Sequence, residues 1–175
     1  MSAAIMRLER TRPQVDCVHH TMSRVVSLVR DLGLAPHPEG GFYREVVRSS
    51  LAVQSKAHDG ERTALTHIDF LLEVGTFSAW HVVTSDELWH HYLGDPLELH
   101  LLEGDGEAAN HRVIVLGHDL EKGEMLHAMV PAGVYQAAAT RGAYSLMGCT
   151  VAPGFEFRDF SMPARHELAG RFGRH

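Results

Sequence analysis

The chain has 175 residues, of which 45% are hydrophobic, and it carries a formal net charge of −6. This length and hydrophobic content suit one domain with a substantial core, so no second domain is needed. The basic residues are scattered along an acidic chain, which excludes an evident nucleic-acid-binding surface and makes an acidic partner unexpected.

No apolar run approaches the roughly 18 residues that a membrane-spanning helix requires. The N-terminus also lacks a compact apolar stretch followed by a small-residue cleavage site, so a secretory signal is not expected. Cys17 and Cys149 are the only cysteines, too few for a disulfide framework and without the spacing of a zinc site. We therefore expect a cytoplasmic protein with no membrane partner, in which Cys149 is a buried thiol.

Residues 1–17 show no clean periodicity and are predicted to form a flexible lead-in. From Val18 to Leu32, apolar residues recur every three or four positions, which predicts an amphipathic helix that Gly33 ends in a left-handed cap. The apolar face of this helix must be buried against the segments that follow. We place a single domain at residues 18–165 and a C-terminal tail at residues 166–175.

After Pro36 the sequence pattern changes to that of strands. Short segments rich in β-branched and aromatic residues are separated by Gly, Pro, Asp and Asn at intervals of roughly eight to twelve residues. These segments are 42–48, 63–74, 77–83, 87–93, 96–102, 112–117, 127–131, 134–139, 144–151 and 155–160. Such a rhythm predicts an all-β sandwich or barrel.

The chain has fourteen histidines, a high number for its length, so position must identify a functional one. Nine of them fall in predicted loops, at chain ends or at solvent-facing positions, and we expect these on the surface: His19, His20, His37, His58, His111, His118, His127, His166 and His175.

The stretch from Gly75 to Gly94, GTFSAWHVVTSDELWHHYLG, carries the clearest motif. Its spacing resembles the first motif of the cupin superfamily, G-x5-H-x-H-x3-E-x6-G, with His81 and Glu87 in place and Val83 at the position of the second His. The later segment PAGVYQ resembles the second cupin motif, P-x-G-x2-H, with Gln136 at the position of its His. Two partial matches in the right order indicate a cupin.

Further segments narrow this resemblance to the cupin-5 type, a family of small single-domain cupins. They are PEGGFYRE (38–45), SDELWHHYLGDPLEL (85–99), LGHDLEKGE (116–124), VPAGVYQAA (130–138) and GCTVAPGFEFRDF (148–160). The resemblance implies a double-stranded β-helix, the cupin jelly-roll barrel of two antiparallel sheets, with the N-terminal α-helix packed against it. Because such barrels leave edge strands that a second copy can cover, we expect a homodimer.

The superfamily motifs would direct His81, Glu87 and Gln136 into the mouth of the barrel. In a metal-binding cupin these residues would supply one imidazole nitrogen, one carboxylate oxygen and one amide oxygen to a divalent ion. That set lacks two nitrogen donors, which makes it weak for a transition metal. No cofactor is therefore certain from the sequence, and a divalent metal ion is one alternative.

A neighbouring histidine pair bears on the same site. If the strand continues regularly from Glu87, Trp89 and His91 share its face while His90 points to the other side. A bulge after Asp86 would reverse this, and the family pattern Trp-His favours His90. We take His90 as the predicted catalytic residue and leave His91 as the alternative.

Without a metal, the same residues still form an acid–base site. His81 is then the general base and Glu87 orients it or shares the proton. Tyr92 or Tyr144 is the candidate acid from the opposite side. The resemblance to deoxysugar epimerases implies an isomerase, epimerase or lyase that acts on a sugar-like or nucleotide-like metabolite.

Other residues are candidates for substrate binding. Arg44, in PEGGFYRE, could hold a carboxylate or phosphate with two hydrogen bonds, or form an ion pair with Glu45 instead. Phe42 and Trp89 could supply apolar walls, with Tyr92 and Gln136 completing the predicted site. Two other function classes stay open: a metal-dependent oxygenase or isomerase, and a non-catalytic protein that binds a metabolite.

Overall fold

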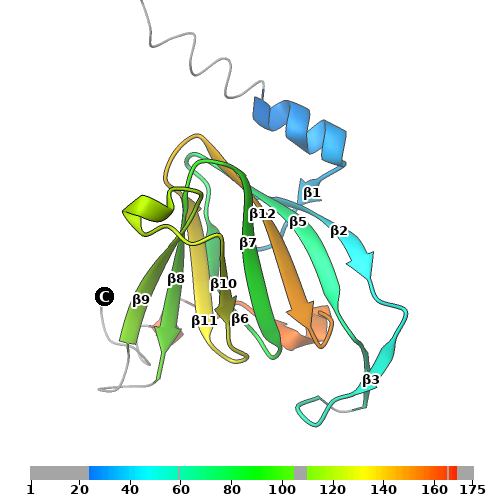
Figure 1. Cartoon of the computed structure of the whole chain (residues 1–175). Helices are drawn as coiled ribbons and strands as arrows, with labels where there is room; N and C mark the ends of the chain where they lie inside the picture. Colours follow the sequence, from blue (N-terminus) through cyan, green and yellow to red (C-terminus); the bar gives the residue numbers. More distant parts are fainter. Residues whose placement is uncertain (1–23, 59, 105–109, 165, 169–175) are drawn as a thin grey trace, which may run out of the picture.

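In the described part of the chain, the body of the fold is formed by two facing antiparallel sheets with a helix that precedes them in the sequence (Figure 1). The computed structural model describes residues 24–58, 60–104, 110–164 and 166–168. One sheet has the order β1 (Ala35–Pro36), β2 (Phe42–Arg48), β5 (Thr66–Glu73), β12 (Tyr144–Ala152), β7 (Asp86–Gly94) and β10 (His127–Val130). The facing sheet has the order β13 (Phe160–Ser161), β6 (Ser78–Val83), β11 (Tyr135–Thr140), β8 (Leu97–Glu103) and β9 (Asn110–Leu116).

Four further short elements lie outside the two large sheets. Strands β3 (Ala52–Gln54) and β4 (Glu61–Thr63) pair with each other outside the two large sheets. The 3-10 turn η2 (Leu120–Lys122) lies between β9 and β10, and η3 (Phe157–Asp159) directly precedes β13. The predicted all-β fold is confirmed, and the long interval between β2 and β5 is explained by the additional β3–β4 pair.

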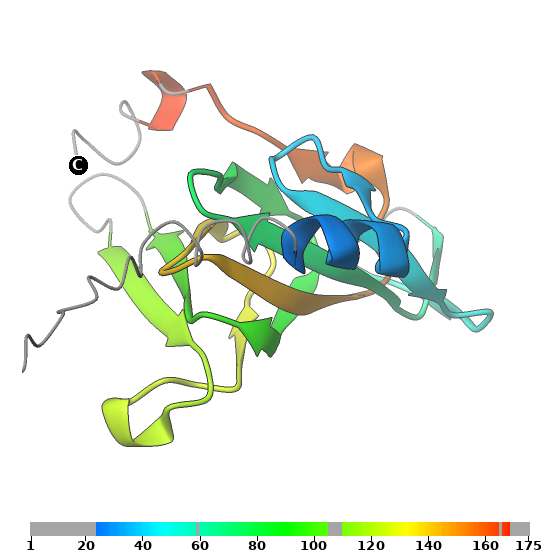
Figure 2. The ribbon, with the colours of Figure 1, turned by 90° about the horizontal axis from the view of Figure 1, so that it is seen from above.

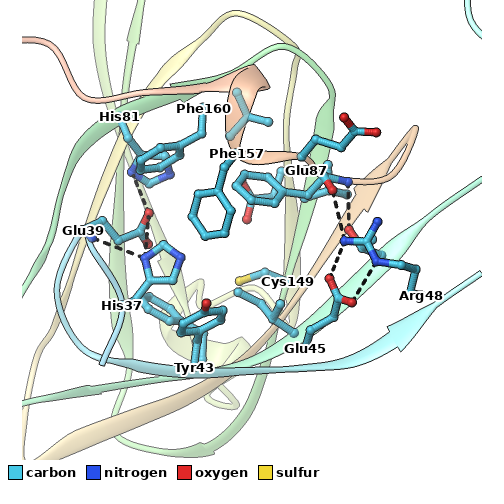
Figure 3. Close-up of a pocket in the computed structure, with 17 residues that line it drawn as sticks. His37, Glu39, Tyr43, Glu45, Arg48, His81, Glu87, Cys149, Phe157 and Phe160 are labelled. Carbon is cyan, nitrogen blue, oxygen red and sulfur yellow. Dashed lines mark hydrogen bonds and ion pairs between the residues drawn. The ribbon is translucent and has the colours of Figure 1, made fainter. Parts of the chain in front are cut away.

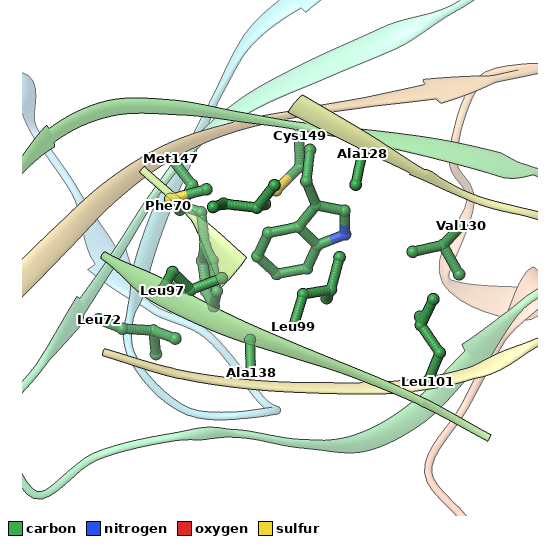
Figure 4. Close-up of a cluster of buried hydrophobic side chains, with 12 residues drawn as sticks. Phe70, Leu72, Leu97, Leu99, Leu101, Ala128, Val130, Ala138, Met147 and Cys149 are labelled. Atoms are coloured by element: carbon green, nitrogen blue, oxygen red, sulfur yellow. The ribbon is translucent and has the colours of Figure 1, made fainter. Parts of the chain in front are cut away.

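The main core lies between the two sheets, where alternate residues of each strand point inward (Figure 4). The six-stranded sheet contributes Phe70, Leu72, Trp89, Ala128, Val130, Met147 and Cys149, and the five-stranded sheet contributes Leu97, Leu99, Leu101 and Ala138, with Leu116 at its edge. Cys149 is a buried free thiol, as predicted. Leu71 belongs to the opposite face of β5 and is also fully buried, because the helix covers it.

The helix covers the outer face of the six-stranded sheet (Figure 2). Residues 24–32 are helical, and Val25 and Leu28 pack against Leu71 of β5 and Leu146 of β12. Gly33 ends the helix with a φ of 62°, and Leu34 N–H donates to the Val29 carbonyl at 2.9 Å, as in a Schellman cap. The predicted helix end and its buried face are therefore confirmed.

Several sequence predictions fall on residues that the structure leaves undescribed. The lead-in at 1–17 and the predicted helix start at Val18 lie outside the described residues, as do residues 169–175 of the predicted tail. Within the described ranges, no helix combines the length and hydropathy needed to cross a bilayer.

Candidate active site

A cavity of about 470 Å³ lies between the sheets, among β2, β5, β6, β7 and β12 (Figure 3). This volume is within the roughly 300–1,000 Å³ typical of small-molecule sites. Glu87 interacts electrostatically with His81 and Glu39, and together with His37 these three residues form the polar end of the cavity. Figure 3 shows His37, Glu39 and His81 on one side of the cavity, and Glu45 and Arg48 across from them. Aromatic side chains of Tyr43, Phe70, Phe155, Phe157 and Phe160 line the space between them.

Strand pairing brings the predicted residues together from both sheets. His81 on β6 is the direct partner of Gln136 on β11, so their side chains lie on the same inner face. Glu87 reaches the cavity from β7 of the facing sheet, where it pairs with Val130 and Val151. All three side chains are buried, with 2% of His81, 6% of Glu87 and 1% of Gln136 exposed.

Gln136 joins the two sheets by hydrogen bonds. Its Nε2 donates to Glu87 Oε2 at 2.6 Å, and its Oε1 accepts from Trp89 Nε1 at 2.9 Å. The indole can only donate, so the amide oxygen must face Trp89 and the amide nitrogen must face Glu87. Gln136 therefore supports the carboxyl of Glu87, while Trp89 belongs to the core with 1% of its surface exposed.

Glu39 is a second buried carboxyl group at the same end of the cavity. Its Oε1 accepts from Ser78 Oγ at 3.0 Å, and its Oε2 lies 3.3 Å from His81 Nδ1 and 3.6 Å from His37 Nδ1. Its backbone carbonyl accepts from Ala79 N–H at 2.8 Å, which fixes the β1–β2 turn against β6.

Two glycines make this turn possible. Gly40 has a φ of 112°, and a Cβ there would lie 2.2 Å from the Phe77 carbonyl oxygen. Gly41 has a φ of 70°, and a Cβ there would lie 2.6 Å from the Leu71 carbonyl oxygen. Larger residues would move the turn away from the sheet, and Glu39 with it.

The hydrogen bonds of His81 fix the tautomer of its neutral ring. Nδ1 lies 2.8 Å from the Ala79 carbonyl oxygen, which can only accept, so Nδ1 carries the proton. Nε2 is then the basic nitrogen of the neutral imidazole. This arrangement leaves a proton acceptor on a residue that lines the cavity.

Burial dominates the ionisation of this cluster. It raises the pKa of Glu39 to about 8 and that of Glu87 to about 7. Burial also lowers the pKa of His37 to about 4, with His81 adding to the effect, and it lowers the pKa of His81. Near neutral pH the two imidazoles are therefore uncharged, and both carboxyl groups carry a proton for a substantial part of the time.

Cys149 also borders the cavity, next to Glu87. Burial raises the pKa of its thiol well above the ordinary value, and the nearby Glu87 and Glu39 carboxyl groups add to this shift. The thiolate is the reactive form of cysteine, so these surroundings favour an unreactive thiol.

The opposite side of the cavity carries a charged pair. Arg48 donates to Glu45 through Nε at 2.9 Å and Nη2 at 2.7 Å, and it also reaches the Phe155 carbonyl oxygen at 3.3 Å. The register of β2 shifts between Glu45 and Val47. This bulge lets Glu45 and Arg48, three positions apart, face the same cavity.

The predicted metal ligands do not fit a divalent ion. Among the described residues, no group of three or more His, Cys, Asp or Glu side chains is placed to hold a metal. The Gln136 amide oxygen accepts from Trp89 and its nitrogen donates to Glu87, while the apolar Val83 lines the cavity two positions after His81. The set His81, Glu87 and Gln136 therefore offers two free donors rather than three.

His90 lies on the outer face of β7, away from the cavity. Strand alternation continues from Glu87, which buries Trp89 and His91 and turns His90 outward. On that outer face His90 lies 6.2 Å from the His127 ring and 6.3 Å from the Tyr92 ring. Tyr92 shares this face, where it contacts His67 at 3.2 Å, so neither residue meets His81.

His91 points inward but does not line the cavity either. Its Nε2 donates to the Asp95 carbonyl oxygen at 2.9 Å, and its ring lies 4.8 Å from that of His118. The alternative histidine is therefore a buried structural residue near the η2 turn.

Phe42, Arg44 and Tyr144 lie under the helix side of the six-stranded sheet. Phe42 and Tyr144 pack against the cluster that buries the helix. Arg44 lies 3.8 Å from Asp69 and contacts the region of Gly33. The predicted residues of PEGGFYRE thus occupy the wrong face of β2, since the cavity takes Tyr43 and Glu45 instead.

Two histidines that we expected on the surface have buried side chains. The His37 side chain is 7% exposed and forms a cavity wall, and His58 is 8% exposed, with Nε2 at 3.1 Å from Thr84 Oγ1. His111, His118, His127 and His166 are exposed, as predicted. His37 and Glu39 were missed because they lie in a turn, and the adjacent Gly40 and Gly41 are the one signal that marked it.

Comparisons with known proteins agree with this architecture. The family Cupin_5, described as "Cupin superfamily (DUF985)", matches residues 26–163. A hypothetical protein from Leishmania major shares 35% identity over 81% of this chain and 88% of its own, with a TM-score of 0.75. A Shewanella oneidensis protein shares 33% identity over 83% of this chain and 88% of its own, also with a TM-score of 0.75.

A more distant structure shares the fold alone. Oxalate decarboxylase from Bacillus subtilis has 12% identity and a TM-score of 0.53, over 77% of this chain and 32% of its own. No curated protein matches the sequence.

Proposed function

Because this chain belongs to the Cupin_5 family (DUF985) of the cupin superfamily, we propose that its cavity catalyses proton transfer on a small polar metabolite. The observation that supports this most is the meeting of a neutral imidazole, His81, with two protonatable carboxyl groups, Glu39 and Glu87, in one buried cavity. The reaction class is isomerase, epimerase or lyase. A sugar-like or nucleotide-like carbonyl compound is the expected substrate.

Each group has a defined role in this proposal. His81 Nε2 removes the proton from a substrate carbon next to a carbonyl group, so that the C–H bond breaks and an N–H bond forms. Glu39 or Glu87, in its protonated form, donates a hydrogen bond to the carbonyl oxygen as negative charge develops there. Delivery of a proton to the same carbon on the opposite face, from a protonated carboxyl group, completes epimerisation, and return of the proton from His81 to a neighbouring carbon completes isomerisation.

The pKa values suit these roles. A general acid or base works best when its pKa is close to the working pH. Burial brings the pKa of Glu87 to about 7 and that of Glu39 to about 8, so both can exchange a proton near neutral pH. These carboxyl groups replace Tyr92 and Tyr144 as the candidate acids, since both tyrosines lie outside the cavity.

The test is exchange of hydrogen for deuterium. Compact aldoses, amino sugars and keto compounds are incubated with the protein in deuterated water, and mass spectrometry follows the gain of one mass unit at carbon. We expect exchange with the wild-type protein and a loss of at least about 100-fold in His81→Gln, as is typical when a general base is removed. His90→Ala is the matched control, because this histidine lies on the outer face and should leave exchange unchanged.

Two results would count against the proposal. Equal exchange in wild type and His81→Gln would remove the assigned base. If a compound of the panel binds with the same affinity to wild type and Glu87→Gln and never gains deuterium, the protein is a metabolite-binding cupin without catalysis.

A further inference from the structure

We propose that the cavity selects a compact organic cation. Its ammonium group would lie between the aromatic rings of the lining and the buried carboxyl groups of Glu39 and Glu87, which we call the inner carboxyl groups. This inference rests on the proposed function and narrows its substrate class to sugar-like carbonyl compounds that carry an ammonium group, which excludes anionic nucleotide-like ones. Three observations support it: the carboxyl groups in the lining, the hydrogen bonds that pair Arg48 with Glu45, and the arrangement of the aromatic rings.

The lining of the cavity is rich in carboxyl groups. Glu39, Glu45, Glu87 and Glu156 line it, whereas Arg48 is the only Lys or Arg in the lining among the residues that the structure describes. Arg48 is already paired with Glu45, to which it donates two hydrogen bonds of 2.9 and 2.7 Å. An anionic ligand would have to break that pair and then face the remaining carboxyl groups.

The outer carboxyl Glu156 has cationic partners of its own. Arg158 Nε lies 2.7 Å from Glu156 Oε2, and Arg62 Nε lies 3.8 Å from Glu156 Oε1. The inner carboxyl groups differ, because within the described part of the chain neither Glu39 nor Glu87 pairs with a Lys or Arg side chain. Their neighbours are the imidazoles of His37 and His81, the Gln136 amide and the Cys149 thiol.

A cation that entered would therefore meet two buried carboxyl groups without a permanent counterion. Ionising either group in the empty cavity is unfavourable because burial opposes the charge. A ligand cation within about 4–6 Å would offset that cost and favour the ionised form.

The aromatic rings provide the second attraction. The centre of the Phe160 ring lies 5.4 Å from that of His81, 6.0 Å from that of Phe155 and 6.5 Å from that of Phe157. These rings form a continuous wall next to the polar end of the cavity. Tyr43 continues it on the other side, 4.4 Å from the His37 ring. The faces of such rings attract ammonium groups within about 6 Å of the ring centre. Figure 3 shows Tyr43, Phe157 and Phe160 around the space between Glu39 and Glu45.

The experiment compares two ligands of nearly equal shape. Choline carries a quaternary ammonium, and 3,3-dimethylbutan-1-ol has a carbon in place of that nitrogen. We expect titration calorimetry to show at least about tenfold tighter binding of choline to the wild-type protein, a ratio within the range of a partly desolvated cation–aromatic contact. Because choline has no titratable nitrogen, this ratio reports the charge alone.

Substitutions in the lining test which side chains produce the preference for choline over the neutral alcohol. Phe157→Leu and Phe160→Leu keep an apolar side chain and should bring the ratio of the two affinities toward one, while the affinity for the neutral alcohol changes little. Glu87→Gln should weaken choline alone. Phe77→Leu is the matched control, because Phe77 is exposed and lies outside this cavity, and it should leave the ratio unchanged.

The wild-type comparison decides the inference even if a variant fails to fold. Equal affinity for the two ligands, tighter binding of the alcohol, or no binding of choline up to millimolar concentration would overturn it. Deuterium exchange on an uncharged sugar without a choline preference would overturn the cation inference and leave the proton-transfer proposal intact. A choline preference without deuterium exchange on any compound would overturn the proton-transfer proposal and support the cation inference.

Discussion

Gln136 Nε2 donates a 2.6 Å hydrogen bond to Glu87 Oε2 and so connects the two sheets at the polar end of the cavity. The same amide accepts from Trp89 Nε1, which holds the largest core side chain in place. In this chain the position of the last cupin-motif His therefore holds a residue that supports a carboxyl group. The site and the core depend on the same amide.

Replacing this amide should affect stability and ionisation together. In Gln136→Leu, the buried Trp89 N–H and the Glu87 carboxyl both lose a partner, which we expect to lower the free energy of unfolding by about 2–4 kcal/mol. The pKa of Glu87 should rise further, because the Gln136 hydrogen bond favours the ionised form. Urea unfolding and carbon-13 NMR titration measure the two effects. Gln54→Leu, on the exposed strand β3, is the control and should stay within about 0.5 kcal/mol of wild type.

The buried carboxyl groups also predict a fall in stability at alkaline pH. Folding raises the pKa of Glu87 from 4.5 to about 7 and that of Glu39 from 4.5 to about 8, so the folded protein retains protons that the unfolded chain has released. Their contribution is fully present below about pH 4.5 and is lost as the pH rises through about 7 and 8. The free energy of unfolding should therefore decrease between pH 6.5 and 9.

In this pH range the effect of the carboxyl groups on stability can be distinguished from that of the histidines. Folding lowers the pKa of His37 and His81 below 6.5, so their opposite effect on stability arises only when the pH falls below that value. Glu39→Gln should flatten the curve above pH 6.5 and exceed wild type at pH 9 by about 1–3 kcal/mol. Chemical unfolding at four pH values measures this. A wild-type curve that stays flat between pH 6.5 and 9 would show that the two carboxyl groups ionise as easily as exposed ones.

Two substitutions should convert the cavity into a metal site. Val83 lines the cavity two positions after His81, and Gln136 pairs directly with His81, so imidazoles at both positions would point inward. We expect Val83→His/Gln136→His to bind Zn²⁺ or Mn²⁺ with an increase in thermal stability, because three imidazoles and Glu87 complete a four-ligand set. Wild type prepared without a His-tag should bind far less. About one equivalent of metal in wild type, lost in His81→Ala, would contradict the poor fit of the natural residues.

How far the sequence predicts this site depends on strand alternation. His81, Glu87 and Gln136 occupy motif positions whose inward orientation is set by strand register, so spacing alone located them. In PEGGFYRE, alternation shows which residues share a face of the strand. The sequence does not show which of the two faces points into the cavity. The prediction that Phe42 and Arg44 line the site is wrong, because the structure turns Tyr43 and Glu45 inward.

Residues outside the strands could not be located by periodicity at all. His37 and Glu39 reach the cavity because the Gly40–Gly41 turn packs against β5 and β6, a contact between segments far apart in the sequence. The predicted strand 155–160 is wrong for most of its length, because residues 157–159 form the η3 turn and only Phe160 belongs to β13. This aromatic segment reaches the cavity because β13 pairs with β6. Such contacts follow from tertiary packing, which no local pattern encodes.

The two arginines of β2 provide the last prediction, because they lie on opposite faces of one strand. Arg48 neutralises Glu45 at the cavity, so Arg48→Gln frees that carboxylate and should strengthen choline binding about three- to tenfold, as expected for one added charge near a protein surface. Arg44→Gln is the matched control. It removes only the 3.8 Å pair with Asp69 on the helix side, so choline affinity should be unchanged. Calorimetry at constant ionic strength measures both variants. Weaker choline binding in Arg48→Gln would contradict this prediction, because it would mean that the guanidinium supports the site or contacts the choline hydroxyl and does not merely neutralise Glu45.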